Sequence, residues 1–109
     1  MYGVSVRPWE AEEIELSSFR HKGLKQLYEQ DDARKLAPGM TDKLRKLLFA
    51  MQTADDLDQL RRFPGWRLHA LKGEMKDLWS LTVTGNWRIV FHYDPSSNRA
   101  QEIDLVDYH

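Results

Sequence analysis

The chain has 109 residues, 41% of them hydrophobic, with four each of Trp, Tyr and Phe, which suits one domain with its own core. It has no cysteine, which excludes disulfides and cysteine zinc sites, and its net charge of -1 gives no support for strong nonspecific nucleic-acid binding. It also has neither a long apolar run nor a signal-peptide pattern, so we expect a cytoplasmic protein that does not contact a membrane.

The basic residues are unevenly distributed along the chain. Residues 61–93 contain 6 Lys and Arg against 2 Asp and Glu, whereas residues 1–60 contain 9 against 11. The later stretch therefore predicts a local anion-facing surface, although a solvated face without function would show the same excess.

The first residues predict an extension followed by a strand and a helix. Gly3, Pro8 and several acidic residues discourage packing, so we expect residues 1–13 to form a flexible N-terminal extension and residues 14–109 a single domain. A short strand is expected over residues 14–19. Apolar residues at helical spacing then predict a helix from about residue 24 that ends near Leu36, before Pro38.

A second helix is the clearest local prediction. Thr41 is a good N-cap, and an apolar stripe follows at helical spacing. Residues 54–60 predict one more short helical turn, and Pro64-Gly65 should end the helical part of the chain. The stripe consists of Leu44, Leu47, Leu48 and Met51.

The hydrophobic period changes to two after Gly65. Strands are expected at residues 66–71, 78–84, 87–93 and 100–106, with a two-residue turn at Gly85-Asn86 and a longer one at residues 94–98. The predicted fold class is α+β: two N-terminal helices pack on one face of a twisted, mainly antiparallel sheet of four to five strands.

Alternation along these strands predicts which side chains share the face away from the helices. That face should carry Arg67, His69, Ser80, Thr82, Arg88 and His92, beside the loop cations Lys72 and Lys76. Such a set can bind a phosphodiester through Arg67, Lys72, Lys76 and Arg88. Cationic residues on a wet sheet face need no function, however, and His92 or His69 alone would be an ordinary strand histidine.

Several familiar kinds of site have no counterpart in the sequence. The four histidines lack the spacing of a zinc site, and no phosphate-binding glycine loop occurs, so neither a metal nor another cofactor is expected. RNA cleavage requires neither, because the ribose 2′-hydroxyl is the nucleophile. A protein then has to supply a base, an acid, cations and alignment.

Four strings in register extend over residues 17–109. Together they resemble the HigB branch of the RelE/ParE toxin superfamily. The strings are Ser18-Phe19-Arg20-His21-Lys22-Gly23-Leu24, residues 64–73 (PGWRLHALKG), residues 79–88 (WSLTVTGNWR) and the terminal Asp107-Tyr108-His109.

The resemblance implies a RelE-like, microbial-RNase-like fold and a ribosome-dependent endonuclease that cleaves messenger RNA at A-site codons. It also implies a partner, a HigA-like helix-turn-helix antitoxin, and contact with DNA only through that antitoxin. The residues that it associates with binding the RNA backbone are Lys72 and Arg88. Those that it associates with catalysis are His69, Asp107, Tyr108 and His109.

The chain end poses a geometric condition. In an unbroken last strand, Asp107 and His109 would share the side of Ile103 and Leu105 and face away from His69, so we expect a bulge or strand end near Val106. Two other functions stay open: a ParE-like gyrase poison that does not cut RNA, and a plain protein-interaction module.

Overall fold

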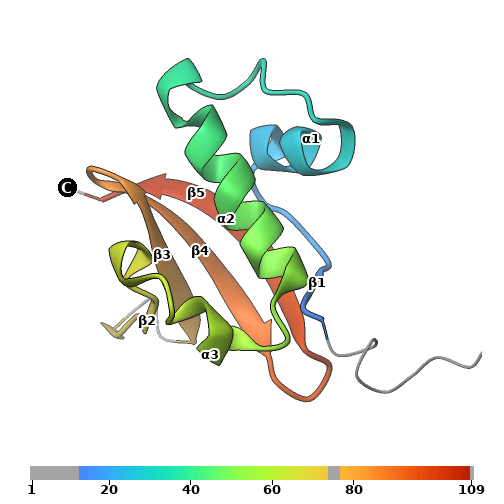
Figure 1. Cartoon of the computed structure of the whole chain (residues 1–109), viewed down its shortest axis with the longest axis vertical. Helices are drawn as coiled ribbons and strands as arrows, with labels where there is room; N and C mark the ends of the chain where they lie inside the picture. The colour runs from blue at the N-terminus through green and yellow to red at the C-terminus, as the bar shows by residue number, and fades with distance from the viewer. Residues whose placement is uncertain (1–12, 74–76, 109) are drawn as a thin grey trace, which may run out of the picture.

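The computed structural model describes residues 13–73 and 77–108 and has the expected α+β architecture. Five strands form one sheet in the order β1-β5-β4-β3-β2, and the helices lie on one face of it (Figure 1). The other face carries no helix in the described part of the chain. We call it the open face.

Three long antiparallel strands make the centre of the sheet: β3 (Leu78–Thr84), β4 (Trp87–Asp94) and β5 (Arg99–Asp107). Their alternating apolar residues bury one face against the helices, as period two requires. Leu81 and Ile89, which are register partners, are both 0% exposed. Two-residue strands complete the edges: β1 (Glu15–Leu16) runs parallel to β5, and β2 (His69–Ala70) runs antiparallel to β3.

Three helices cover the buried face: α1 (Lys22–Gln30), α2 (Thr41–Thr53) and α3 (Leu57–Leu60). The predicted stripe of α2 is confirmed, since its four members are all buried. The short helix expected within residues 54–60 is confirmed as α3, which begins where the Asp56 carboxylate accepts a hydrogen bond from the Gln59 N–H at 3.2 Å.

The predicted ends of the first two helices were partly wrong. α1 stops at Gln30 instead of near Leu36, because Asp31 takes a left-handed conformation (φ 54°) and its N–H donates to the carbonyls at residues 26 and 27. A 3₁₀ turn, η2 (Pro38–Met40), then leads directly into α2. Met40 is therefore the N-cap, and Thr41 is the first helical residue.

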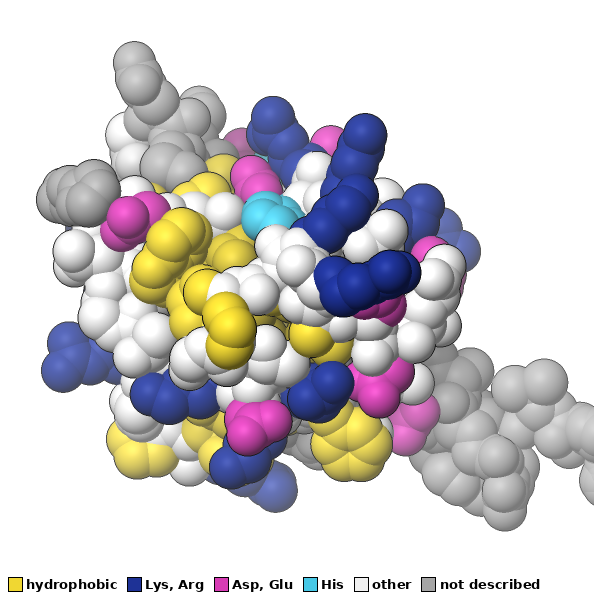
Figure 2. All heavy atoms as spheres, turned by 90° about the horizontal axis from the view of Figure 1, so that it is seen from above, with side chains coloured by type: hydrophobic (Ala, Val, Ile, Leu, Met, Phe, Trp, Pro, Cys, Tyr) yellow, Lys and Arg dark blue, Asp and Glu magenta, His cyan; other side chains and the backbone are white. Residues whose placement is uncertain are grey.

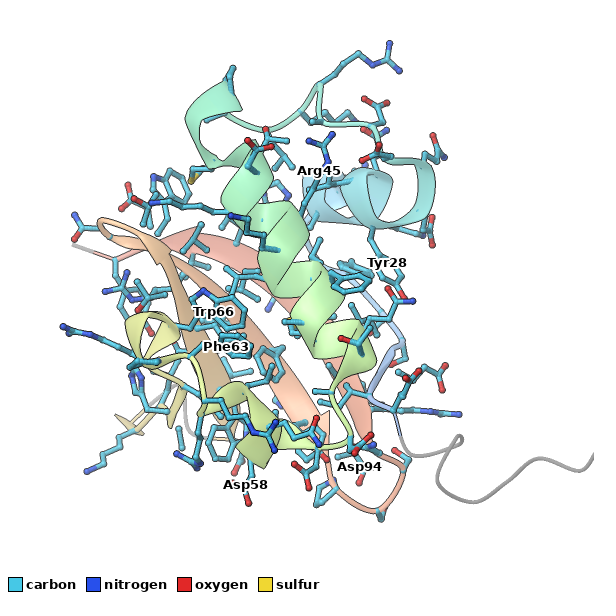
Figure 3. The ribbon with its side chains drawn as sticks, in the orientation of Figure 1. Tyr28, Arg45, Asp58, Phe63, Trp66 and Asp94 are labelled. Atoms are coloured by element: carbon cyan, nitrogen blue, oxygen red, sulfur yellow. The ribbon has the colours of Figure 1, made fainter. Side chains whose placement is uncertain are left out.

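The predicted strand over residues 66–71 was also largely wrong. Pro64–Trp66 forms a 3₁₀ turn, η3, and only His69 and Ala70 pair with β3. The Trp66 ring stacks on Phe63 with a centroid distance of 4.1 Å (Figure 3), and this local contact favours a turn over an extended chain. Helical structure therefore continues past Pro64-Gly65.

The start of α1 shows why His21 and Gly23 occur together. His21 caps the helix, with Nδ1 accepting from the Leu24 N–H at 3.2 Å. A Cβ on Gly23 would lie 2.9 Å from the His21 ring, so only glycine fits below the capping imidazole. His21 therefore has a structural role as the N-cap of α1.

Some predictions concern residues that the structure does not describe. Residues 1–12 of the expected extension, Lys76 and His109 lie outside the described ranges. None of the helices described is both long and apolar enough to cross a membrane.

Candidate functional site

The strand register assigns side chains to the open face. His69 pairs with Ser80, Ser80 with Val90, and Val90 with Asp104, so these four form one row across the sheet. Thr82, Arg88 and Val106 form the next row. The predicted placement of His69, Ser80, Thr82 and Arg88 away from the helices is therefore confirmed, as is that of His92, which follows Val90 by two residues on β4. The strand alternation from which Arg67 was placed on this face was wrong, because Arg67 closes η3 and lies outside the strands.

His69 is exposed on the edge strand and is held by one backbone contact. Its Nδ1 lies 2.8 Å from the Arg67 carbonyl oxygen. A carbonyl can only accept a hydrogen bond, so this contact places the neutral ring's proton on Nδ1 and its lone pair on Nε2. Nε2 is then the atom able to take a proton from a substrate.

Arg67 orients that carbonyl through its own backbone. It closes η3 in the left-handed region, with φ 49° and ψ 53°, a conformation that costs a non-glycine residue energy. The turn brings its carbonyl to the ring of a residue only two positions later. The Arg67 side chain is exposed, as is that of Lys72, and the two residues flank β2 in the chain.

Arg88 lies half-buried on the central strand β4. Its Nη1 donates to the carbonyl oxygens of Gly85 at 2.7 Å and Trp87 at 3.0 Å, both at the β3–β4 turn. The two contacts restrain the guanidinium. A guanidinium with this restraint is suited to bind a phosphate on the open face.

The end of the chain follows the β3–β4 turn. β5 ends at Asp107, which pairs with Trp87, and the Tyr108 N–H donates to the Asn86 carbonyl at 2.8 Å. The strand thus ends one residue beyond the expected place, and its bulge lies at Glu102 (φ 54°) instead of near Val106.

Alternation beyond the bulge separates the terminal residues. Tyr108 follows Val106 on the open face, whereas Asp107 follows Leu105 on the side that the helices cover. The geometry therefore brings Tyr108 to the face of His69 and Arg88, and it does not bring Asp107 there.

Comparison with known protein families identifies the family to which the chain belongs. Residues 17–109 match the family model described as the RelE-like toxin of the type II toxin–antitoxin system HigB. The chain belongs to the HigB-like toxin family. Its solved structural relatives include a YoeB/ParE toxin from Agrobacterium tumefaciens (TM-score 0.51, 21% identity, 88% of this chain and 99% of that one). A YoeB dimer from Staphylococcus aureus gives a TM-score of 0.50 at 16% identity, over 89% and 98%.

Two curated proteins are related to this toxin in sequence. Endoribonuclease HigB of Proteus vulgaris is 36% identical over 94 residues, which cover 86% of this chain and 99% of that protein. Toxin HigB-1 of Vibrio cholerae serotype O1 is 32% identical over 76 residues, or 69% of this chain and 80% of that protein. The structural likenesses show the fold alone, while the family match establishes the toxin family.

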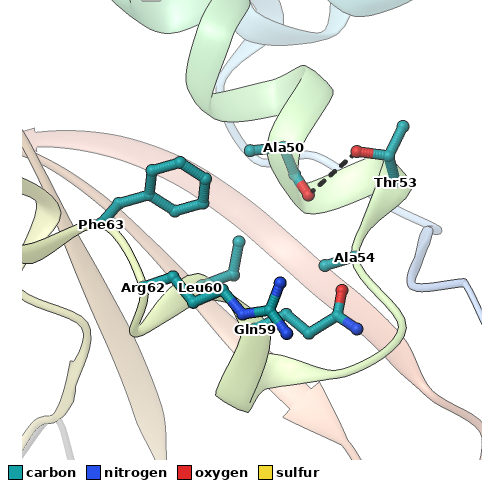
Figure 4. Close-up of a pocket in the computed structure, with 7 residues that line it drawn as sticks. All are labelled: Ala50, Thr53, Ala54, Gln59, Leu60, Arg62 and Phe63. Carbon is teal, nitrogen blue, oxygen red and sulfur yellow. Dashed lines mark hydrogen bonds between the residues drawn. The ribbon is translucent and has the colours of Figure 1, made fainter.

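On the face of the toxin that Figure 2 shows, Lys and Arg side chains lie dispersed, with Asp and Glu side chains among them. A cavity of about 130 Å³ between α2 and α3, lined in part by Ala50, Leu60 and Phe63, lies on the helix side (Figure 4). It is thus remote from the face that bears His69 and Arg88.

The resolved pKa shifts belong to loops and the helix side. Hydrogen bonds from Arg34 lower the pKa of Asp32 to about 2, and the hydroxyls of Ser97 and Ser96 lower the pKa of Asp94. Burial raises the pKa of Tyr93. The hydrogen bonds of Asp32 and Asp94 are made within their own turns.

The described residues contain no cluster of three or more side chains that could hold a metal ion.

Sequence reasoning missed two charged residues on the open face: Arg20 and Glu102. They line a cavity there together with His92 and Asp104. Arg20 comes from the segment between β1 and α1, and the bulge at Glu102 interrupts the alternation from which a face could be predicted. Glu102 carried no other signal in the sequence.

Proposed function

We propose that this toxin is an endoribonuclease that cuts messenger RNA at the ribosomal A site through attack of a ribose 2′-hydroxyl on the adjacent phosphate. The family match and the name of its Proteus vulgaris relative support RNA cleavage. The observation that carries the chemistry is the 2.8 Å contact of His69 with the Arg67 carbonyl, because it leaves Nε2 as a base on the face of Arg88.

In the proposed reaction, His69 Nε2 takes the 2′-hydroxyl proton. The 2′-oxygen then bonds to phosphorus, the bond to the 5′-oxygen breaks, and a 2′,3′-cyclic phosphate and a 5′-hydroxyl result. Arg88 neutralises the charge that develops on the phosphorane, and Arg67, Lys72 and Lys76 bind neighbouring phosphates. No metal is required for this route, since the nucleophile belongs to the substrate.

A second group must give a proton to the leaving 5′-oxygen. Asp107, Tyr108 and His109 are the candidates, and Tyr108 is the one whose position on the open face favours it. A phenol beside the leaving oxygen can donate that proton or stack on a base. Asp107 would serve from the neighbouring side of the strand by orienting the chain end.

Partners follow from membership of a type II system and the proposed target. We expect a HigA-like helix-turn-helix antitoxin to bind the toxin and to make any DNA contact, and we expect the ribosome to position the message. Co-expression of the toxin with the antitoxin candidate encoded beside it, followed by co-purification, tests the first point. Recovery of the toxin alone would contradict it.

Primer extension on translating ribosomes with the purified toxin tests the function directly. The proposal predicts cuts in register with codons and fewer cuts in the same message without ribosomes. Intact message accompanied by double-strand DNA breaks would instead select a gyrase poison. Intact message without DNA breaks would select an interaction module.

A further inference from the structure

One hydroxyl group on the open face is buried without a partner. Ser80, on β3, is 0% exposed, and its Oγ makes no hydrogen bond with any described residue. Of the polar and charged residues that the structure describes, Ser80 alone is buried. A hydroxyl that is removed from water and left unpaired destabilises the fold, so an exception of this kind calls for a physical reason.

The position of Ser80 in the sheet points to that reason. Ser80 is the register partner of His69, the proposed base, so the inference rests in this respect on the proposed function. Directly opposed side chains of an antiparallel pair have Cβ atoms about 4.5 to 5.5 Å apart. Rotation of the side chains alone can therefore bring Ser80 Oγ to the His69 ring, without movement of the backbone.

The other near neighbours of Ser80 on the open face are poorer partners. Val90 lies beside it in the row and Leu78 precedes it on the strand, and neither has a polar side-chain atom. Thr82 lies two residues further along β3, at about 7 Å. That separation is too large for a hydrogen bond between the hydroxyls of two short side chains.

Two longer polar side chains lie diagonally to Ser80 on β4. Arg88 pairs with Thr82 and directs its Nη1 to the carbonyl oxygens of Gly85 and Trp87. His92 pairs with Leu78. Diagonal neighbours are about 7 to 8 Å apart, so His69 is the best-placed polar partner among the described side chains.

Protonation of the His69 ring changes what it offers to Ser80. In the neutral ring the proton lies on Nδ1, at the Arg67 carbonyl, and Nε2 carries only a lone pair. The imidazolium adds a charged N–H at Nε2 while Nδ1 keeps its proton. A hydroxyl oxygen that accepts from this N–H makes a bond about twice as strong as one between neutral groups. An interaction that strengthens during the reaction raises kcat and leaves substrate binding unchanged.

We propose that Ser80 is a positioning residue for His69. When His69 takes the 2′-hydroxyl proton, Ser80 Oγ accepts a hydrogen bond from the new Nε2–H and holds the charged ring over β3. Ser80 keeps its own proton, so no covalent bond forms or breaks at this side chain, and the ring releases its extra proton to water after the cut. The hydroxyl thus destabilises the free toxin and stabilises the transition state.

Replacement of Ser80 by alanine tests both halves of the proposal. Because the hydroxyl is unpaired in the free chain, Ser80→Ala should keep or raise the unfolding midpoint in urea. Single-turnover cleavage of a ribosome-bound message should slow by about 10- to 100-fold at saturation, with an unchanged half-saturating concentration. A lower midpoint would show that the hydroxyl is paired within the fold, and an unchanged rate would show that the reaction does not use it. Either result overturns the proposal.

A second serine provides the matched control. The Ser17 hydroxyl donates to the Ala100 carbonyl at 3.1 Å, so its loss removes a hydrogen bond of the fold. Ser17→Ala should therefore lower the midpoint and leave the rate unchanged, which is the reverse of the result expected for Ser80→Ala. Equal effects of the two substitutions on the rate would contradict a specific role for Ser80.

NMR of the free chain separates this inference from the proposed function. At about pH 5, where histidine rings are charged, the His69 Nε2–H should exchange slowly with water in the wild type and rapidly in Ser80→Ala. Equal exchange in both chains, or a change confined to the His92 ring, would overturn the contact. A Ser80-dependent signal in a chain that cuts no RNA would support the contact and defeat the endoribonuclease. Cleavage at equal rates by both chains would defeat the role of Ser80 and leave the endoribonuclease intact.

Discussion

Replacement of His69 by glutamine removes the proposed base while leaving a side chain of similar reach. General-base catalysis contributes about 10²- to 10⁴-fold, or about 3 to 5 kcal/mol of transition-state stabilisation. Because the His69 ring is exposed and its one described contact is to the Arg67 carbonyl, the free energy of unfolding should fall by no more than about 1 kcal/mol. Rate and stability should therefore separate clearly in this variant.

The assay pairs single-turnover cleavage of a ribosome-bound message with urea denaturation of the same preparation. His69→Gln should lose about two to four orders of magnitude in rate and keep nearly the wild-type unfolding midpoint. A rate within tenfold of wild type in a folded variant would refute the role of His69 as the general base. A large loss of stability would refute the view that its contacts are only local.

Substitutions at three further residues test the scaffold. Arg67→Gly accepts the left-handed conformation and should keep the His69 proton on Nδ1, whereas Arg67→Val resists it by about 1 to 2 kcal/mol and should disturb the tautomer, as read from ring ¹⁵N shifts; identical shifts in both would disprove the link. Leu81→Ala, at 0% exposure, should lower the free energy of unfolding by about 2 to 5 kcal/mol in urea denaturation, and a loss below 1 kcal/mol would argue against the packing described. Asp94 has a pKa lowered from 3.8 by Ser97 and Ser96, so Asp94→Asn should lower the thermal midpoint at pH 7, with the difference vanishing as the pH falls through the folded-state pKa; a difference that grows in acid would contradict that sign.

The partition of the sheet into two faces could be predicted because β3 pairs with β4 in regular alternation from Leu78 to Thr82. Leu81 and Ile89 are buried against the helices, while Ser80 and Arg88 lie on the open face, where Ser80 is itself 0% exposed. The buried stripe of α2 could be predicted in a similar way, because the spacing of apolar residues indicates which side of a long helix is buried.

The end of α1, the orientation of the His69 ring and the bulge in β5 depend on backbone conformations that the residue types do not predict. Asp31, Arg67 and Glu102 all have positive φ, and these residues end α1, orient the His69 ring and create the bulge in β5. Aspartate, arginine and glutamate give weak signals for that conformation, unlike glycine. Both the length of α1 and the charged rim of the open-face cavity therefore became visible only in the structure.

The central claim is that a 2′-hydroxyl, activated at His69, cuts the RNA. The most direct test is the chemistry of the ends left by the purified toxin on a ribosome-bound message. The account predicts a 2′,3′-cyclic phosphate on the upstream fragment and a 5′-hydroxyl on the downstream one, and no cleavage when the nucleotide before the cut is 2′-deoxy. A 3′-hydroxyl with a 5′-phosphate, or undiminished cleavage of the 2′-deoxy message, would contradict it.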